Sequence, residues 1–281
     1  MKIQEAYELL MKQVYPFSQK EIEFDNSSLI DGMTLAMHWI HKWHNLPPQA
    51  LLHSPEVTSL INKMTCAMIW ITESDKPIPK ELIHDPEIKS INGMTCAMYW
   101  IQFHYSLSSK ELLHDPLVKD SIGCTCAMYW IWYVQSLPPR ELLHDSRIQD
   151  DNGYTCAMYW ICCNKSLPPK ELLHDPTLSA FDGKTCAMIW IEEVMTLPPK
   201  ELLHDPCIKD KNGDTCALIW IEHLNTFPPK ELHYKELLSC IPDNIKIDNT
   251  VGNHIVLNSC ENKYIALSSA MSSFVPELKL T

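Results

Sequence analysis

The segment NGYTCAMYWICCNKSLPPKELLHDPTLSA, residues 152–180, recurs with small changes along most of the chain. Further copies follow at a period of thirty residues, and they begin at Asn92, Ile122, Asp182 and Asn212, with degenerate copies at Asp31 and Asn62. A repeat of this length is typical of a stacked array, in which each unit packs only against its neighbours. The 281 residues therefore predict one elongated domain.

Two columns of the repeat predict a turn that leads into a helix. Six of the seven glycines stand two residues before a threonine, and they are Gly32, Gly93, Gly123, Gly153, Gly183 and Gly213. This placement predicts turn residues with a positive φ angle, which glycine adopts without steric cost. The hydroxyl group of a helix N-cap threonine accepts a hydrogen bond from a first-turn amide. We therefore predict N-caps at Thr34, Thr65, Thr95, Thr125, Thr155, Thr185 and Thr215.

The segment after each threonine, most often TCAMYWI, is apolar on all sides. An apolar run of this length fits either a buried helix or a buried strand, and its length does not separate the two. The alanine and methionine inside the run, together with the threonine cap, favour the helix. The strand stays open as an alternative.

A second helix is predicted in each repeat over the segment PPKELLH. Its prolines stand where the first turn of a helix tolerates them, and a Leu-Leu pair follows. The residue before a proline is disfavoured in the α region, so Asp-Pro steps should end this helix. Such steps occur at Asp85, Asp115, Asp175 and Asp205.

A Gly-x-Thr turn, an inner helix and an outer helix with a Leu-Leu pair resemble the ankyrin repeat over residues 31–234. The departures are Thr-Cys-Ala-Met in place of Thr-Pro-Leu-His, a tryptophan in place of a small residue, and a period of 30 instead of 33. The resemblance implies an all-α fold, a curved α-solenoid of about seven two-helix repeats with terminal caps. Other α-solenoids are the second reading. A leucine-rich-repeat-like coil is the third, although its Leu-x-Leu and Asn pattern is missing.

Three parts of the chain are expected. Residues 1–30 are predicted to hold an N-terminal capping helix over residues 1–14 and a connection. Residues 31–234 form the repeat array. Residues 235–281, where the pattern fades, are predicted to be a C-terminal cap or a partly mobile tail.

Composition restricts the class of partner and the compartment. The formal net charge of −12 repels phosphate backbones, so we expect no nucleic-acid partner. No apolar run approaches the roughly 20 residues that span a bilayer, and residues 1–14 lack the apolar core of a signal peptide. These features predict a cytoplasmic protein, with the nucleus as an alternative, and no membrane partner. We expect it to act as a monomer.

The cysteine and histidine columns are predicted to be structural. Stacked helices would hold Cys66, Cys96, Cys126, Cys156, Cys186 and Cys216 about 8–10 Å apart, beyond disulfide reach. No second cysteine pair completes a zinc motif, so we expect no metal and no cofactor. The histidines that close the second segment are predicted to interact with the C-terminal end of a helix dipole. They are His53, His84, His114, His144, His174 and His204.

The tryptophan column is predicted to be packing between repeats and not a ligand ladder. Its members are Trp39, Trp70, Trp100, Trp130, Trp160, Trp190 and Trp220. Common enzyme motifs are missing, so we expect no enzyme. A thiol-dependent enzyme that uses Cys163 and His174 stays an alternative. A regulatory arm that acts through its C-terminal segment is another.

The positions that vary between repeats are the candidate binding residues. One is the residue between Gly and Thr, which is Met94, Cys124, Tyr154, Lys184 or Asp214. The other is the pair after the repeated Ile, which is Gln102-Phe103, Trp132-Tyr133, Cys162-Cys163, Glu192-Glu193 or Glu222-His223. The ankyrin resemblance implies that such positions line a concave, partner-binding face. We therefore predict a non-catalytic protein–protein interaction scaffold whose partner carries a basic and apolar segment.

Overall fold

The computed structural model describes residues 2–12, 25–224, 226 and 228–232. The chain divides into two compact units, Met1–His144 and Asp145–Thr281, and each is treated by itself. Of the predicted C-terminal segment, residues 235–281, every residue lies outside the described part.

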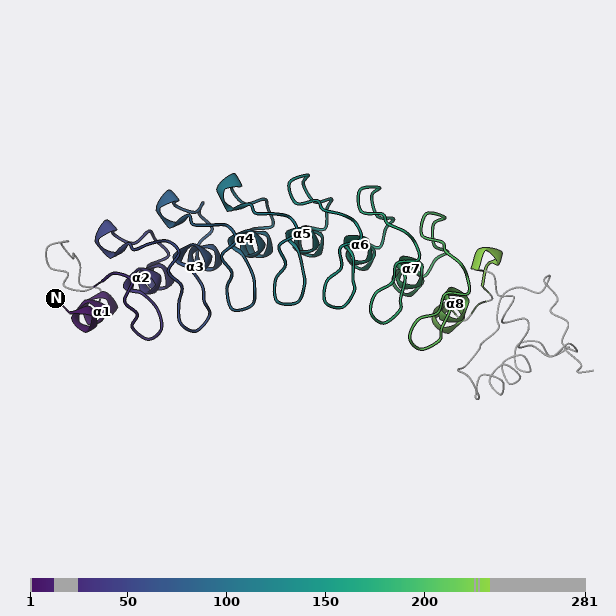
Figure 1. Ribbon diagram of the computed structural model, residues 1–281, viewed down its shortest axis with the longest axis horizontal. Coiled ribbons are helices and arrows are strands. Elements are labelled where there is room, and N and C mark those ends of the chain that lie inside the picture. Colours follow the sequence, from purple (N-terminus) through teal and green to yellow (C-terminus); the bar gives the residue numbers. More distant parts are fainter. Residues whose placement is uncertain (1, 13–24, 225, 227, 233–281) are drawn as a thin grey trace, which may run out of the picture. The chain divides into compact units, whose positions relative to one another are not determined.

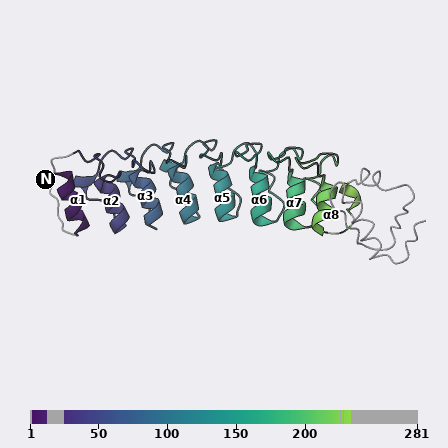
Figure 2. The same cartoon turned by 90° about the horizontal axis from the view of Figure 1, so that it is seen from below.

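Helices make up the regular structure of both units. Unit 1 contains α1 (Ile3–Met11), α2 (Leu35–Trp43), α3 (Cys66–Glu73), α4 (Cys96–His104) and α5 (Cys126–Val134), and unit 2 contains α6 (Cys156–Asn164), α7 (Cys186–Val194) and α8 (Cys216–Leu224). Within each unit, consecutive helices are in contact and run parallel (Figure 2). The described residues hold isolated β-bridges but no strand, so the predicted all-α class is confirmed.

The predicted threonine caps start the helices. In α6, the hydroxyl oxygen of Thr155 accepts the amide of Met158 at 3.3 Å, and Thr155 itself is buried. The helix ends at Lys165, whose φ angle of 49° is left-handed and whose amide donates to the carbonyl of Ile161 at 2.9 Å. The helical reading of TCAMYWI is therefore correct, and the strand alternative is wrong.

The helices α2 and α4 to α8 are each preceded by a hairpin loop that contains a glycine with positive φ. Gly153 has a φ angle of 80°, and its amide donates to the carbonyl of Asp150 at 3.0 Å. The next hairpin stacks on this one through a hydrogen bond from the amide of Phe181 to the carbonyl of Asn152, 2.9 Å long. All six predicted glycines have positive φ, and Lys63 adopts φ 51° in the repeat that lacks the glycine.

The predicted second helix is wrong in its extent, because PPKELLH forms only a single turn. Short 3-10 helices occupy this place in four repeats: η2 (Gln49–Leu51), η3 (Lys80–Leu82), η4 (Lys110–Leu112) and η5 (Lys230–Leu232). In unit 2, residues 170–172 and 200–202 form a turn of the same length. Closing the first helical turn is costly, and the proline pair and the Asp-Pro step leave too few residues between them to repay that cost. The hairpins and these turns lie on opposite sides of the helices (Figure 1).

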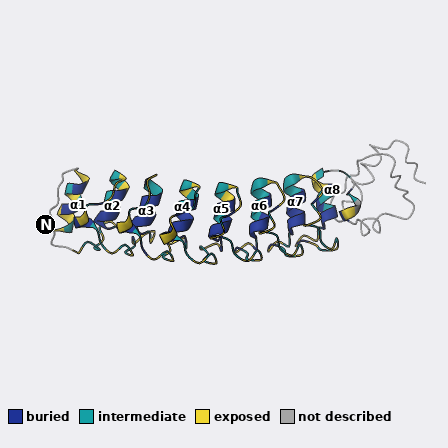
Figure 3. Cartoon of the chain, turned by 90° about the horizontal axis from the view of Figure 1, so that it is seen from above, coloured by how far each residue is buried: buried dark blue, intermediate teal, exposed yellow. Residues whose placement is uncertain are grey.

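The core lies between neighbouring helices and under the short turns. Ala157, Met158 and Ile161 of α6 are fully buried and belong to a cluster that includes Leu202 and Leu232. Only the first leucine of each Leu-Leu pair is buried. Burial is concentrated at the N-terminal end of each repeat helix and decreases toward its C-terminal end (Figure 3).

The predicted N-terminal helix is α1, and it packs against the first repeat. Ala6 and Leu10 of α1 form a buried cluster with Leu35 and Leu51. This contact covers the apolar side of α2 that no preceding repeat covers.

Candidate functional site

The predicted residues of the hairpins are less accessible than the sequence suggested. Met94 and Cys124 are only 7% and 2% exposed, so neither offers surface to a partner. Tyr154, Lys184 and Asp214 are half-buried. The side chain between Gly and Thr is therefore buried in some repeats, as at Met94 and Cys124, and partly exposed in others.

The predicted residues at the ends of the helices in unit 1 form an exposed aromatic group. Phe103 is 45% exposed and Trp132 is 51% exposed, whereas Gln102 and Tyr133 are half-buried. Tyr105, which the sequence analysis did not select, is 60% exposed and caps the end of α4. We call Phe103, Tyr105, Trp132 and Tyr133 the aromatic patch.

Ring contacts connect Tyr105, Trp132 and Tyr133 of the aromatic patch. The ring centroids of Trp132 and Tyr133 lie 6.2 Å apart with nearly parallel planes, and Tyr105 of the α4 end lies 6.5 Å from Tyr133. Phe103 stacks on Tyr99 at 6.4 Å. Aromatic neighbours in this range stabilise one another and limit ring motion, so the patch is preorganised.

The neighbouring tryptophan column has a different role. Trp130 is 9% exposed, and its indole N–H donates to the hydroxyl of Ser136 at 2.9 Å. Equivalent bonds to the residue six positions later are made by Trp100, Trp160, Trp190 and Trp220. The column thus ties each helix to the loop that follows it. Trp132, two residues further along α5, faces outward.

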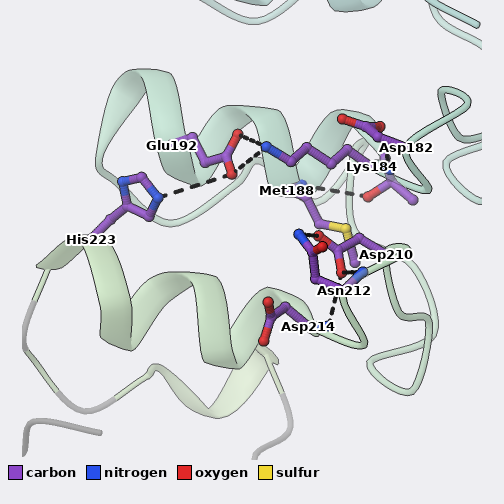
Figure 4. Close-up of polar contacts among 9 residues, drawn as sticks. Asp182, Lys184, Met188, Glu192, Asp210, Asn212, Asp214 and His223 are labelled. Carbon is purple, nitrogen blue, oxygen red and sulfur yellow. Dashed lines mark hydrogen bonds and ion pairs between the residues drawn. The ribbon is translucent and has the colours of Figure 1, made fainter. Parts of the chain in front are cut away.

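In unit 2, two of the predicted acidic residues, Glu192 and Glu193, form ion pairs. Lys184 lies 2.8 Å from Glu192, and His223 approaches the same carboxylate at 3.9 Å (Figure 4). Lys165 lies 3.7 Å from Glu193. Burial opposes the charge of Lys184, but Glu192 outweighs it and raises the pKa of this ammonium. These pairs partly neutralise the predicted acidic surface, which leaves the exposed Glu222 as its clearest member.

A shallow depression of about 390 Å³ lies among the hairpins of unit 2. Its lining consists of Asn152, Tyr154, Phe181, Asp182 and Lys211. The structure therefore places the predicted Tyr154 beside a hollow that contains one acidic and one basic side chain.

Cys162, Cys163 and Cys186 do not have the properties of catalytic thiols. Burial raises the pKa of Cys186 to about 12 and that of Cys162 to about 11. Burial also raises the pKa of Cys163, so little thiolate is present near neutral pH. Both ring nitrogens of His174 are engaged elsewhere, with Thr155 and with the backbone. These observations disfavour the thiol-enzyme alternative.

The histidines at the end of the PPKELLH segment hydrogen-bond to the threonine N-caps of the helices, and they do not lie at a helix end. The Nδ1 of His174 donates to the carbonyl of Asp175 at 2.8 Å, so its Nε2 accepts from the hydroxyl of Thr155, also at 2.8 Å. The thiol of Cys186, in the next repeat, lies 3.7 Å from the same nitrogen. The Thr–His bond recurs at His53, His84, His114, His144 and His204. The predicted helix-dipole role is therefore wrong, because the residue before His53, His84 and His114 has already left the short helix and is extended.

An aspartate that the sequence analysis missed organises the hairpin. Asp150 is 3% exposed, and its Oδ1 accepts the amides of Asn152 and Tyr154 at 2.9 and 2.7 Å. Its Oδ2 accepts the hydroxyl of Tyr159 at 2.7 Å. Asp120 makes the same three kinds of bond in its own repeat. Burial of this charge is tolerated because both oxygens are hydrogen-bonded.

Within the described ranges, none of the helices combines the length and the apolar character that crossing a membrane requires. The same ranges hold no group of three or more His, Cys, Asp or Glu side chains placed to bind a metal ion.

No family model and no curated protein matches the sequence. Among solved structures, the chain is similar to the ankyrin repeat domain of Bcl-3, described as a unique member of the IkappaB protein family. The identity is 13% and the TM-score 0.45, over 72% of this chain and 97% of that one. It is also similar to EF0377, an ankyrin repeat protein, with 15% identity and a TM-score of 0.35 over 65% and 88% of the two chains. Both TM-scores are below 0.5, so the fold and the site are derived from the repeats themselves. The described part of the chain is an all-helical repeat array that is similar to ankyrin repeat structures.

Proposed function

We propose that the chain is a non-catalytic protein-interaction module that binds a partner protein through the aromatic patch of unit 1. The observation that carries the proposal is the exposure of Phe103, Tyr105 and Trp132, at 45%, 60% and 51%. Exposed aromatic groups of this kind mark interaction sites in soluble proteins.

The chemistry of the patch suits a protein partner. Tryptophan and tyrosine are enriched among interface hot spots, where truncation to alanine costs about 2 kcal/mol or more. Their rings are rigid, so binding sacrifices little side-chain entropy. The ring contacts of Trp132 with Tyr133 and of Tyr105 with Tyr133 add to this rigidity.

Charge and thiol state support the remaining parts of the proposal. A net charge of −12 favours a basic partner and disfavours nucleic acid. All ten cysteines in the described part of the chain are free, which fits a reducing compartment such as the cytoplasm or nucleus. We propose a monomer that contributes one partner-binding surface.

Affinity capture with the full chain and with two variants tests the proposal. The double variant Trp132→Ala with Tyr133→Ala should reduce the captured amount of a specific partner at least tenfold, because it removes the centre of the patch. Its melting temperature should stay close to that of the parent, since Trp132 is half exposed.

Phe181→Ala is the matched control, because Phe181 is an aromatic residue of 58% exposure in unit 2. Capture should survive this change. If the double variant melts normally and still captures every partner of the parent chain, the aromatic patch is not the binding surface.

A further inference from the structure

Two neighbouring helices of unit 1 carry the same pair of aromatic rings at equivalent places. In α4, the ring centroids of Tyr99 and Phe103 lie 6.4 Å apart, and the ring planes differ by 24°. In α5, the ring centroids of Tyr129 and Tyr133 lie 6.0 Å apart, and the ring planes differ by 16°. The residues of the second pair stand one repeat after those of the first. Two consecutive repeats thus contribute one ring pair each to the region of the aromatic patch.

Hydrogen bonds fix the inner ring of each pair to its own hairpin. The hydroxyl of Tyr99 donates to the hydroxyl oxygen of Ser90 at 3.2 Å. The hydroxyl of Tyr129 donates to Oδ2 of Asp120 at 2.7 Å. The outer ring of each pair stacks on this anchored ring. Because α4 and α5 are in contact, and packed helices lie about 8–10 Å apart, the two ring pairs are held about one helix spacing from each other.

The spacing of the two ring pairs restricts the backbone of a ligand that contacts both. A polyproline II helix has three residues per turn and rises about 3.1 Å per residue, so residues three positions apart recur on one side about every 9 Å. This distance agrees with the helix spacing. In a β-strand, residues on one face recur about every 7 Å, which is shorter than the helix spacing. A polyproline II segment therefore places one residue on each ring pair.

Hydrogen-bond donors beside the rings distinguish this ligand from an α-helix. Residues seven positions apart in an α-helix also recur at a suitable distance, about 10.5 Å, but the helix uses its carbonyl groups in internal hydrogen bonds. A polyproline II helix has no internal hydrogen bonds, so its carbonyls accept from outside. Tyr105 and Tyr133 carry phenolic hydroxyl groups that donate, and their ring centroids lie 6.5 Å apart. Proline-rich segments are recognised at such aromatic-lined sites.

We infer that the aromatic patch binds a proline-rich segment of the partner protein in the polyproline II conformation. One proline packs on Phe103 of α4, and a second proline, three positions away, packs on Trp132 and Tyr133 of α5. This inference rests on the proposed function and names the chemistry of the partner. The segment is already extended before it binds, so little chain entropy is lost on rigid rings. The net charge of −12 favours a basic residue beside the prolines.

Matched sets of immobilised peptides test the spacing with the full chain. The first set holds short peptides of varied sequence that share two prolines three positions apart and a following lysine. The second set moves one proline by a single position, and the third set replaces one proline by alanine. We expect the tightest binders of the first set to bind at least tenfold more tightly than their counterparts in the other two sets. Equal binding of the counterparts, or binding to no set, would overturn the inference.

Removing the ring of α4 tests the contact of the first proline. Phe103→Ala should lower binding of the two-proline peptides at least tenfold, down to the level of their one-proline counterparts. Phe103→Leu, which keeps an apolar side chain without an aromatic face, should show the same loss. Leu117→Ala is the control, because Leu117 is 51% exposed in unit 1 but lies outside the patch, and it should leave binding unchanged. A full preference for two prolines in both Phe103 variants would contradict the inference.

Competition separates this inference from the proposed function. Capture from a cell lysate that depends on Trp132 and Tyr133 is repeated with an excess of the tightest two-proline peptide. Loss of that capture supports the inference. Undiminished capture that still requires Trp132 and Tyr133 would leave the interaction function in place and refute the role of proline.

Discussion

The two ends of a single helix, α5, have different tasks. At its N-terminal end, Cys126, Ala127 and Met128 are at most 1% exposed, and the same three residue types recur in most repeats. At its C-terminal end, Trp132 is half exposed, and its position changes identity from repeat to repeat. In α5, the residues that repeat along the chain are buried in the stack, whereas the varying position of Trp132 is exposed.

The largest expected effect comes from the two tryptophans of α5, because Trp130 is buried in the stack and Trp132 is exposed. Trp130→Ala should lower the free energy of unfolding by about 3–5 kcal/mol, since it removes a large buried ring and its bond to Ser136. Trp132→Ala should change it by about 0.5 kcal/mol or less. Urea denaturation followed by circular dichroism measures both. Equal losses would mean that the two ends of the helix are not distinct.

The hairpin glycines give the next largest effect. At Gly153, an added Cβ would lie 2.5 Å from the backbone nitrogen of Phe181, and its φ of 80° also disfavours other residues. At Gly213, φ is 86° but no described atom lies within 4 Å of the added carbon. Gly153→Ala should therefore cost well over 1 kcal/mol, and Gly213→Ala about 1 kcal/mol.

Thermal melts of the two glycine variants separate strain from crowding. The difference between their losses of stability measures the steric cost of a Cβ atom where one hairpin stacks on the next. If Gly213→Ala loses as much stability as Gly153→Ala, the whole effect comes from the positive φ angle and none from crowding.

The smallest expected effect is a pH dependence of stability that comes from the Thr–His hydrogen bonds. Burial lowers the pKa of His84 from its ordinary value of 6.5. The unfolded chain then binds a proton at this histidine more readily than the folded chain does. The stability contributed by neutral His84 is therefore complete above pH 6.5, and it is lost as the pH falls from 6.5 toward the pKa of the folded state. The melting temperature should be flat from pH 7 to 8 and fall by a few degrees on acidification to about pH 5. His84→Gln should reduce this slope, and an unchanged slope would exclude His84 as its source.

Much of the stack could be predicted from residues that recur at equivalent positions of the repeats, because each of them meets a simple local structural requirement. A glycine before Thr155 requires a turn, the threonine requires a helix start, and an apolar run requires burial. The second segment could not be read in the same way. Its length was judged from helix-compatible residues, whereas His174 at its end is held by a side-chain hydrogen bond to Thr155, nineteen positions earlier in the chain.

The candidate site was only partly predictable for a related reason. Variation identified Phe103 and Trp132, but it did not reveal that Met94 would turn inward. Tyr105 was missed because it follows the helix, at a position that also varies. The hairpin aspartates could have been found: an Asp stands nine residues before a tyrosine at Asp120 and Asp150, and the hydrogen bonds follow that spacing.

In this chain, hydrogen bonds from one hairpin to the next recur within each unit, from the amides of Leu60, Ile91 and Ser121 in unit 1 and of Phe181 and Lys211 in unit 2. The segments of the chain are close to interchangeable at the level of the sequence, since TCAMYWI occurs unchanged at residues 95–101, 125–131 and 155–161. Unequal recombination between such segments adds or removes thirty residues in frame. Every amide and carbonyl at the new junction then meets a partner of the kind it had before. Such an exchange keeps the buried positions and changes the order of the exposed helix ends.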